Sequence, residues 1–309
     1  MTKLNPTNKF GHDLLAFDTL DSTNKRAMSE AQQGAAEGTV VWAALQTAGR
    51  GRFGRAWESR LGDSLCFSLI LRPPFEIERA PLIPLVLSVS VARFLADLGG
   101  ERVQIKWPND VLLDGKKVCG ILVELAASDN RVEHMIAGIG INVRSWEMES
   151  GLADHVTSLM QEHIKFDTAT ESSEYSVHLE RRQRFPAEDL RACKHLSCSA
   201  KKQDCTSVDV ATSDILSLLW KLLPYLEEDY RAFCASNENG LGALRPTYDR
   251  YLLNQNVSVE VLDPHGNYTG IARGIGDAGE LLVEIDDGEL RRIYAGEVSV
   301  RGIGRYAPH

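Results

Sequence analysis

The chain has 309 residues, of which 43% are hydrophobic and 25% are charged, so it falls in the range of ordinary globular proteins and is long enough for about two domains. Its formal net charge of -9 argues against broad nucleic-acid binding by phosphate neutralisation, because that mode needs a concentrated excess of Lys and Arg. Without a signal peptide, or any run of about 18 apolar residues that would span a membrane, we expect a cytoplasmic protein with reduced cysteines and no membrane or nucleic-acid partner.

The first third of the chain predicts strands that alternate with a helix and a loop. Asp21, Ser22 and Thr23 are suitable N-caps for a helix that ends at Gly34. A loop rich in glycine and arginine occupies residues 49–55. The expected strands cover residues 14–17, 39–46 and 64–71, and the expected helix covers residues 24–33.

The middle of the chain predicts a buried helix followed by β-structure. Apolar residues fall at helical spacing over 84–98, and Gly99 and Gly100 give a stop signal. The dipeptide Asp114-Gly115 is a strong signal for a two-residue hairpin. The expected strands cover residues 103–106, 111–113, 116–124 and 133–143, and the glycines of the last strand allow close approach of a ligand.

The remaining chain predicts a polar insertion, a helix and a small β-barrel. Residues 160–209 lack periodicity, so we assign them no chemistry. Helical periodicity returns over 213–234, where Pro224 is expected to kink or split the helix. Short β-type runs over 256–302 predict a barrel. Within the insertion, the spacing fits no standard zinc pattern, so we expect no metal site from Cys193, His195, Cys198 and Cys205.

The sharpest motif is Gly49-Arg50-Gly51-Arg52-Phe53-Gly54-Arg55, followed by Trp57. Glycines let backbone amides turn toward a ligand, and arginines neutralise phosphate oxygens with paired donors. The motif differs from both the dinucleotide-binding glycine fingerprint and the P-loop. Its glycines and arginines indicate a site for a polyphosphate or an adenylate. The alternatives are a nucleic-acid contact and an exposed basic turn.

Two further motifs carry polar groups at the ends of strands. In Lys106-Trp107-Pro108-Asn109-Asp110-Val111, the Asp110 carboxylate can coordinate Mg²⁺ or orient an amine, although such a sequence is also typical of a plain turn. In the run KKVCGILVE, Lys117 can reach a pocket beside Gly120, or can be a solvated charge at a strand end.

In this order, these motifs resemble those of biotin protein ligases. The resemblance rests on DSTN at 21–24, Gln46, GRGRFGR with Trp57, KWPNDV, KKVCGILVE, GIGIN at 138–142 and GEVSVRG at 296–302. It implies an α+β fold: a class II synthetase-like, lipoate-ligase-like domain with a mixed sheet over 1–250, including the insertion, and an SH3-like barrel over 256–309. Some relatives carry an N-terminal helix-turn-helix domain, for which we expect no room here.

The resemblance also implies roles for individual residues. Ser22, Thr23, Asn24 and Gln46 are expected to border the biotin ring, and Gly120 and Gly138 to permit close packing against it. Gly49, Arg50, Gly51, Arg52 and Arg55 are expected to bind the biotin carboxylate and the phosphates. Lys117 is expected at the activated carboxyl group, with Asn109 beside Asp110. The expected nucleotide-side contacts are Trp57, Asn142, Glu297 and Arg301, and Arg50, Lys117 and Asp110 are the expected catalytic residues.

The implied activity is formation of biotinoyl-AMP from biotin and ATP with Mg²⁺, followed by transfer of biotin to a lysine of a biotin carboxyl carrier protein domain. The oligomeric state stays open. The alternatives are a lipoate or octanoate ligase, which shares the scaffold, and a binding module without catalysis. GRGRFGR and KWPNDV favour biotin, while Lys117, Glu297 and Arg301 favour an enzyme over a binding module.

Overall fold

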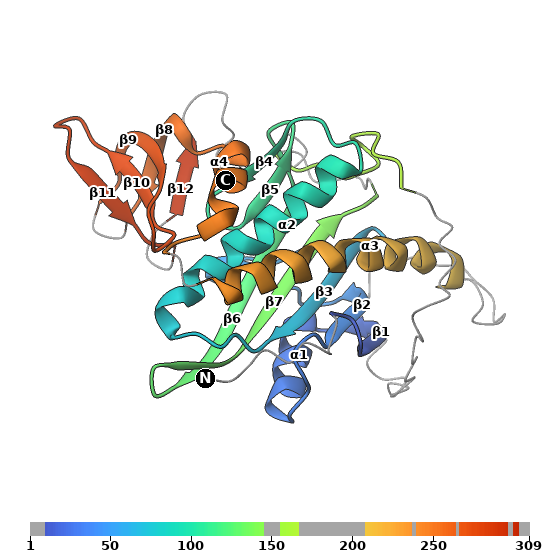
Figure 1. The fold of residues 1–309 in the computed structure, drawn as a ribbon. Helices are drawn as coiled ribbons and strands as arrows, with labels where there is room; N and C mark the ends of the chain where they lie inside the picture. The colour runs from blue at the N-terminus through green and yellow to red at the C-terminus, as the bar shows by residue number, and fades with distance from the viewer. Residues whose placement is uncertain are drawn as a thin grey trace.

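The structure is a computed structural model that describes residues 10–144, 155–166, 208–236, 239–263, 266–295 and 299–302. In these segments the chain forms a seven-stranded mixed sheet and a separate five-stranded antiparallel sheet (Figure 1). The fold class expected from the sequence is confirmed. Glu297 and the four polar residues of the insertion, Cys193, His195, Cys198 and Cys205, lie outside the described residues.

The large sheet is antiparallel except at one edge. Its strand order is β1-β2-β3-β7-β6-β5-β4, and only β1 and β2 run parallel. This order places β7 between β3 and β6, although β3 is far from both in the chain. The strands are β1 (Leu14–Leu20), β2 (Val40–Gln46), β3 (Ser64–Leu71), β4 (Val103–Lys106), β5 (Asp110–Leu113), β6 (Lys116–Ser128) and β7 (Arg131–Asn142).

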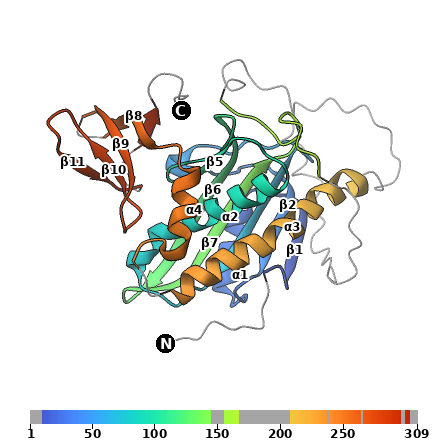
Figure 2. The same cartoon turned by 45° about the horizontal axis from the view of Figure 1, so that its top comes forward.

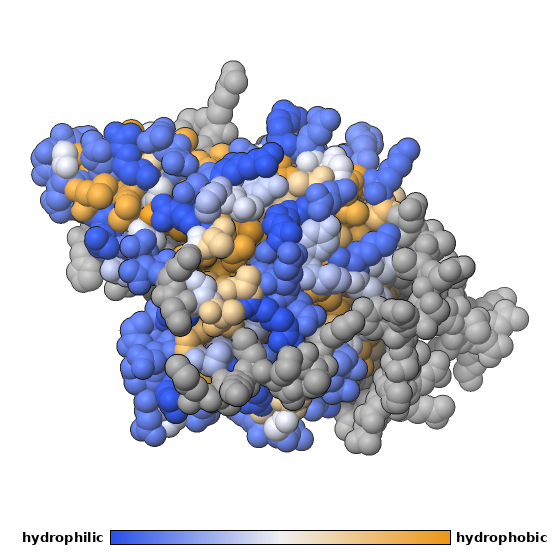
Figure 3. Space-filling view, in the orientation of Figure 1, coloured by the Kyte–Doolittle hydropathy of each residue, from blue (hydrophilic) through white to orange (hydrophobic). Residues whose placement is uncertain are grey.

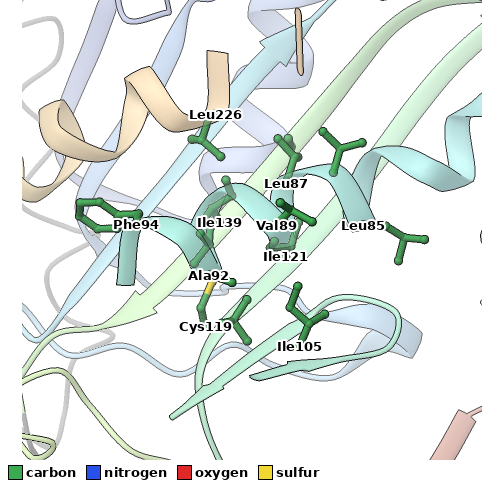
Figure 4. Close-up of a cluster of buried hydrophobic side chains, with 14 of the residues drawn as sticks. Leu85, Leu87, Val89, Ala92, Phe94, Ile105, Cys119, Ile121, Ile139 and Leu226 are labelled. Carbon is green, nitrogen blue, oxygen red and sulfur yellow. The ribbon is translucent and has the colours of Figure 1, made fainter. Parts of the chain in front are cut away.

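Helices cover both faces of this sheet. On one face lie α2 (Ile83–Asp97) and α3 (Val208–Ala235), and Figure 4 shows side chains of α2 such as Leu87 and Val89 packed above Ile121 and Ile139 of the strands. On the other face α1 (Thr23–Gln32) buries Ala27 and Ala31. Because side chains alternate along a strand, β3 directs every second residue toward α1, where the ligand cavity described below is found.

The hairpin predicted at Asp114-Gly115 is confirmed. Both residues have positive φ angles, 49° and 78°, as a two-residue hairpin turn requires. It joins β5 to β6, and β6 and β7 extend beyond the expected bounds, β6 to Ser128 and β7 from Arg131.

The structure differs from the sequence-based expectations at two places before and within α3. Pro224 does not split the helix, because α3 runs from Val208 to Ala235 without a break (Figure 1). Its buried residues Leu222, Leu223 and Leu226 on either side of the proline pack into the main core, which offsets the lost backbone hydrogen bond. Residues just after 160 also belong to the large domain, because Ile164 is buried against its core.

A stretch long and apolar enough to cross a membrane exists, contrary to the expectation from the sequence. It covers Ile77–Asp97, which includes the 3₁₀ helix η2 (Ile77–Leu82) and α2, and 72% of its most apolar window is buried inside the fold. Its apolar side chains are therefore accounted for by packing between the sheet and α3 (Figure 4).

The second sheet is SH3-like and lies beside the β4–β5 end of the large domain (Figures 1 and 2). The indole nitrogen of Trp107 donates to the Gly279 carbonyl at 2.8 Å, and Arg245 of helix α4 (Arg245–Tyr251) donates to the Ile275 carbonyl at 2.9 Å. Its strands are β8 (Gln255–Leu262), β9 (Tyr268–Ile275), β10 (Leu281–Glu284), β11 (Leu290–Ile293) and β12 (Ser299–Gly302).

The surface of the face drawn in Figure 3 is largely hydrophilic, with apolar residues both on the small sheet at its left and over the middle of the face. Leu290 and Tyr294, which belong to or adjoin the edge strand β11, are among the exposed large hydrophobic residues. The ligand cavity does not involve this edge.

Candidate functional site

A cavity of about 160 Å³ lies on the α1 face of the large sheet, and it brings together most of the residues singled out from the sequence. This volume is on the order of ten times what one enclosed water molecule needs, so the cavity admits a sizeable ligand. The predicted residues that line it are Ser22, Thr23, Asn24, Gln46, Arg50, Gly51, Arg52, Arg55, Trp57, Asn109, Asp110, Lys117, Gly120 and Gly138.

One wall of the cavity is a polar cluster at the start of α1. The backbone nitrogen and the hydroxyl of Thr23 both approach Gln46 Oε1, at 2.8 and 3.1 Å. On β3, the Ser68 hydroxyl donates to Asn24 Oδ1 at 2.6 Å, and its oxygen lies 2.8 Å from Thr23 Oγ1. Because Ser22, Thr23 and Asn24 are buried, this wall presents fixed donors and acceptors to a ligand.

The floor of the cavity is formed by glycines of β6 and β7. Gly120 and Gly140 are direct partners across the two strands, and the Trp57 ring lies against both. A Cβ atom on Gly140 would lie 2.5 Å from the Trp57 ring, and one on Gly138 would lie 2.1 Å from Asn24 Oδ1. These positions therefore require glycine, because any side chain would displace a residue of the cavity.

The arginine loop connects the cavity to both parts of the molecule. Arg50 Nη2 forms an ion pair with Glu124 on β6, at 2.9 Å. Arg52 donates to Asn109 Oδ1 at 3.0 Å and also to the carbonyl oxygen of Ala295, which follows β11 of the small sheet. Burial, reinforced by the neighbouring Arg55 charge and opposed by Asp110, lowers the pKa of the Arg52 guanidinium.

The strands β5 and β6 place a second ion pair at the cavity. Lys117 Nζ lies 2.7 Å from Asp110 Oδ1 and 5.6 Å from the centre of the Trp57 ring. The backbone of Lys117 is fixed by hydrogen bonds from its nitrogen to the His155 carbonyl and from the Thr157 nitrogen to its own carbonyl, at 2.8 and 2.9 Å. Lys117 is thus held between β5, through Asp110, and residues 155–157, which lie far from it in the sequence.

The structure does not bring all of the predicted residues to the cavity. Asn142 is buried and donates to the Thr157 carbonyl at 3.0 Å, and it is not among the residues that line the cavity. Gly49 packs against the Trp57 backbone behind the loop. Arg301 lies in β12, but its side chain and the whole of Glu297 are outside the described residues.

Sequence reasoning missed several residues of the site. Ser68 and Gly140 were visible only as members of strands, whereas their contacts depend on the pairing of β3 with β7. Glu124 ends the quoted run KKVCGILVE but was assigned no role. Among the residues that the structure describes, no group of three or more His, Cys, Asp or Glu side chains forms a metal centre.

Comparisons with known proteins agree with this geometry. Residues 16–142 match the model of the Biotin/lipoate A/B protein ligase family, and residues 252–301 match the Biotin protein ligase C terminal domain. The bifunctional ligase/repressor BirA of Bacillus subtilis (strain 168) is 31% identical over 296 residues, which cover 95% of this chain and 76% of that protein.

Two other relatives extend the comparison. The biotin--[acetyl-CoA-carboxylase] ligase of Paracoccus denitrificans is 41% identical over 125 residues, which cover 40% of this chain and 51% of that protein. The solved structure of the biotin protein ligase from Aquifex aeolicus in complex with biotin and ATP is 27% identical and superposes with a TM-score of 0.66, covering 94% of this chain and 99% of that chain.

Proposed function

The chain belongs to the biotin protein ligase family, and on this premise we propose that it activates biotin with ATP and transfers it to a lysine of a carrier protein. The observation that carries the proposal is the convergence, in one cavity, of a buried polar wall, a glycine floor, an arginine loop and the Asp110–Lys117 pair. Each of these parts supplies something that the reaction needs.

The ring of biotin enters the cavity between the polar wall and the glycine floor. Its ureido group needs both donors and acceptors, which the side chains of Ser22, Thr23 and Asn24 supply. The glycines leave the backbone of β6 and β7 open to close contact with an apolar ring. This arrangement has the form of ligand sites that are mostly apolar with a few fixed polar groups.

In the first step the biotin carboxylate attacks the α-phosphorus of ATP, so that a mixed anhydride, biotinoyl-AMP, forms and pyrophosphate leaves. Negative charge on the phosphate oxygens is stabilised by Arg50, Arg52 and Arg55 of the loop. The loop also covers the anhydride and keeps water away from it. No nucleophile of the enzyme is needed.

In the second step the acceptor lysine attacks the anhydride carbonyl, an amide bond forms, and AMP leaves with the carbonyl–phosphate oxygen. The lysine must lose a proton, and we assign its orientation and deprotonation to Asp110. Lys117, paired with Asp110, donates to the carbonyl oxygen on which charge develops.

The family also implies Mg²⁺ bound with the nucleotide. Asp110 is the acidic residue among those that line the described cavity, and one carboxylate together with phosphate oxygens is a usual set of Mg²⁺ ligands. The cavity therefore fits the ion, with the carboxylate of Asp110 as the side-chain group that would hold it. When bound, the ion would neutralise charge on the phosphates.

The relatives' names support a carrier domain of acetyl-CoA carboxylase as the acceptor, and we propose such a partner in the cytoplasm. We further propose that residues 1–250 form the catalytic domain and residues 256–309 the SH3-like domain. The contact of Arg52 with Ala295 supports a role of the small domain in closing the arginine loop.

The test is ATP–pyrophosphate exchange by the purified protein with Mg²⁺, in parallel with biotin, lipoate and octanoate. We expect exchange in the presence of biotin, and none with lipoate or octanoate. Exchange with lipoate or octanoate in its place would assign the chain to lipoate chemistry, and biotin binding without exchange would make it a binding module.

A further inference from the structure

A carboxylate, Glu124, lies behind two residues of the cavity without lining it. Its two oxygens accept hydrogen bonds from Arg50 Nη2 at 3.0 and 2.9 Å, and Oε2 also accepts from Asn24 Nδ2 at 2.8 Å. Glu124 stands on β6 and its side chain is 29% exposed; its bond to Asn24 is partly buried, whereas its bonds to Arg50 are exposed. One side chain thus joins the arginine loop to the polar wall.

The bonds to Glu124 determine how the Asn24 amide is oriented. A carboxylate can only accept, so the amide nitrogen must face Glu124. The amide oxygen then faces Ser68, which donates its hydroxyl hydrogen at 2.6 Å. With no side chain on Gly138, the Asn24 oxygen fits against β7. The ring of contacts leaves a single arrangement of this amide, which is required if Asn24 is to recognise a ligand with distinct donors and acceptors.

The same carboxylate restrains Arg50. The Arg50 side chain is 40% exposed and extends from a loop with two neighbouring glycines, so without a partner it would sample many rotamers. A carboxylate so close to a cavity for anions weakens their binding through space. Its presence is explained if the gain from holding Arg50 in place exceeds that repulsion.

We propose that Glu124 is a positioning residue for biotin: it fixes the Asn24 amide and tethers Arg50 to the sheet, so that both meet the ligand already oriented. This inference rests on the proposed function of the cavity. It assigns Glu124 no contact with biotin or ATP, and its effects pass through Asn24 and Arg50.

The first test compares Glu124→Ala with Glu124→Gln in steady-state exchange. The alanine variant loses all three bonds, so we expect the KM for biotin to rise about tenfold or more while kcat and the KM for ATP change less. The glutamine variant keeps one oxygen acceptor and should recover part of the loss. A fall in kcat with an unchanged KM for biotin would overturn the proposal.

The second test asks whether Glu124 acts through Arg50. In the Arg50→Ala background, Glu124→Ala should weaken biotin binding by a smaller factor than it does in the wild-type chain, because the shared contact has already been lost. Equal factors in both backgrounds, together with a lowered melting temperature, would show a merely structural role. Glu30→Gln is the matched control, because Glu30 pairs with Arg26 on α1 outside the cavity.

Direct calorimetric binding separates this proposal from the proposed function. If the wild-type protein binds no biotin, the function fails, and the same pair of variants is then compared with pyrophosphate as the anionic probe. Weaker pyrophosphate binding by Glu124→Ala would still support the tethering of Arg50. Unchanged or tighter binding would refute it.

Discussion

Lys117 and Asp110 lie on adjacent strands and their charged groups are 2.7 Å apart, although the β6 residue directly opposite Asp110 in the strand register is Gly120. The lysine reaches the carboxylate past a shift in register between Val111 and Leu112. The glycine leaves room for this, because the Lys117 Nζ and Cε atoms would lie 3.1 Å from a Cβ on Gly120. The pair therefore depends on a glycine of the cavity floor.

Replacement of Asp110 by Asn is expected to slow transfer more than activation. The amide cannot accept a proton from the acceptor lysine, so transfer to a carrier domain should fall by roughly 10²–10⁴-fold. Exchange of pyrophosphate, measured on the same protein, should fall by a smaller factor. A normal single-turnover rate of transfer from preformed biotinoyl-AMP would remove Asp110 from its proposed role.

Alanine at the floor glycines should weaken biotin binding in a graded way. At Gly138 the new Cβ meets Asn24 Oδ1 at 2.1 Å, whereas at Gly120 it meets the Trp57 ring at 2.9 Å and the flexible end of Lys117. We therefore expect Gly138→Ala to lose at least tenfold in affinity, equivalent to about 1.4 kcal/mol, and Gly120→Ala to lose less. Calorimetric titration with biotin measures both, and the reverse order would contradict this account of the floor.

Arg52→Lys should raise the KM for ATP more than the KM for biotin. The guanidinium reaches Asn109 and the Ala295 carbonyl with two different nitrogens, and a lysine has only one nitrogen with which to hold both. Loss of one charge-assisted hydrogen bond predicts a rise of about tenfold in the KM for ATP. Exchange kinetics with each substrate varied in turn provide the measurement, and Arg26→Lys on α1 serves as the control.

Trp107→Phe should destabilise the contact between the two sheets. It removes the indole donor to the Gly279 carbonyl and leaves that acceptor without its partner, at a cost of about 1–3 kcal/mol. Trp42→Phe is the matched control, because Trp42 is also buried and its indole nitrogen has no hydrogen-bond partner among the described residues. Urea unfolding of both variants should show the larger loss for Trp107→Phe, and equal losses would refute the interpretation.

Stability should decline in alkaline solution partly through Cys66. Burial raises the pKa of this thiol from its ordinary value of 9.0 to about 11. Below pH 9 the thiol is protonated in both the folded and the unfolded chain, and its contribution to the free energy of unfolding is fully present. As the pH rises from 9 through 11 the thiol of the unfolded chain ionises first, so about 3 kcal/mol of this free energy is lost. Unfolding free energies of the wild type and Cys66→Ser between pH 8 and 10.5 should diverge in slope, and parallel slopes would contradict the prediction.

The order of elements and the two-part organisation were predictable because local signals dominate them. Asp114-Gly115 specified a hairpin, and Gly34 and Gly99 marked the ends of helices near their actual positions. Pro224 does not split α3, because the tertiary packing of Leu222, Leu223 and Leu226 outweighs the local preference of proline.

The contacts within the site were less predictable because they join distant residues. The sequence motif identified Arg50, but its partner Glu124 is reached only through the order of the strands in the sheet. Asn142 lies two residues after Gly140 on β7, so it is expected on the same face of the strand as Gly138 and Gly140. Its amide nitrogen instead donates a hydrogen bond to the Thr157 carbonyl at the end of the strand. The position of residues 155–159 was not predicted, because it depends on hydrogen bonds to Lys117 and Asn142, which are distant in sequence.

The pairing of β3 with β7 has a consequence for when the protein becomes able to bind its ligand. These strands are about 70 positions apart in the chain, and contacts at such separation form slowly because a long loop must first close. Ser68 on β3 and Gly138 on β7 are opposite each other across this seam. A folding chain with only its local hairpins formed has no cavity, so biotin stabilises only molecules in which the seam has closed. Biotin added during refolding should therefore stabilise only molecules in which β3 has paired with β7, and the rates of the earlier folding steps should not change.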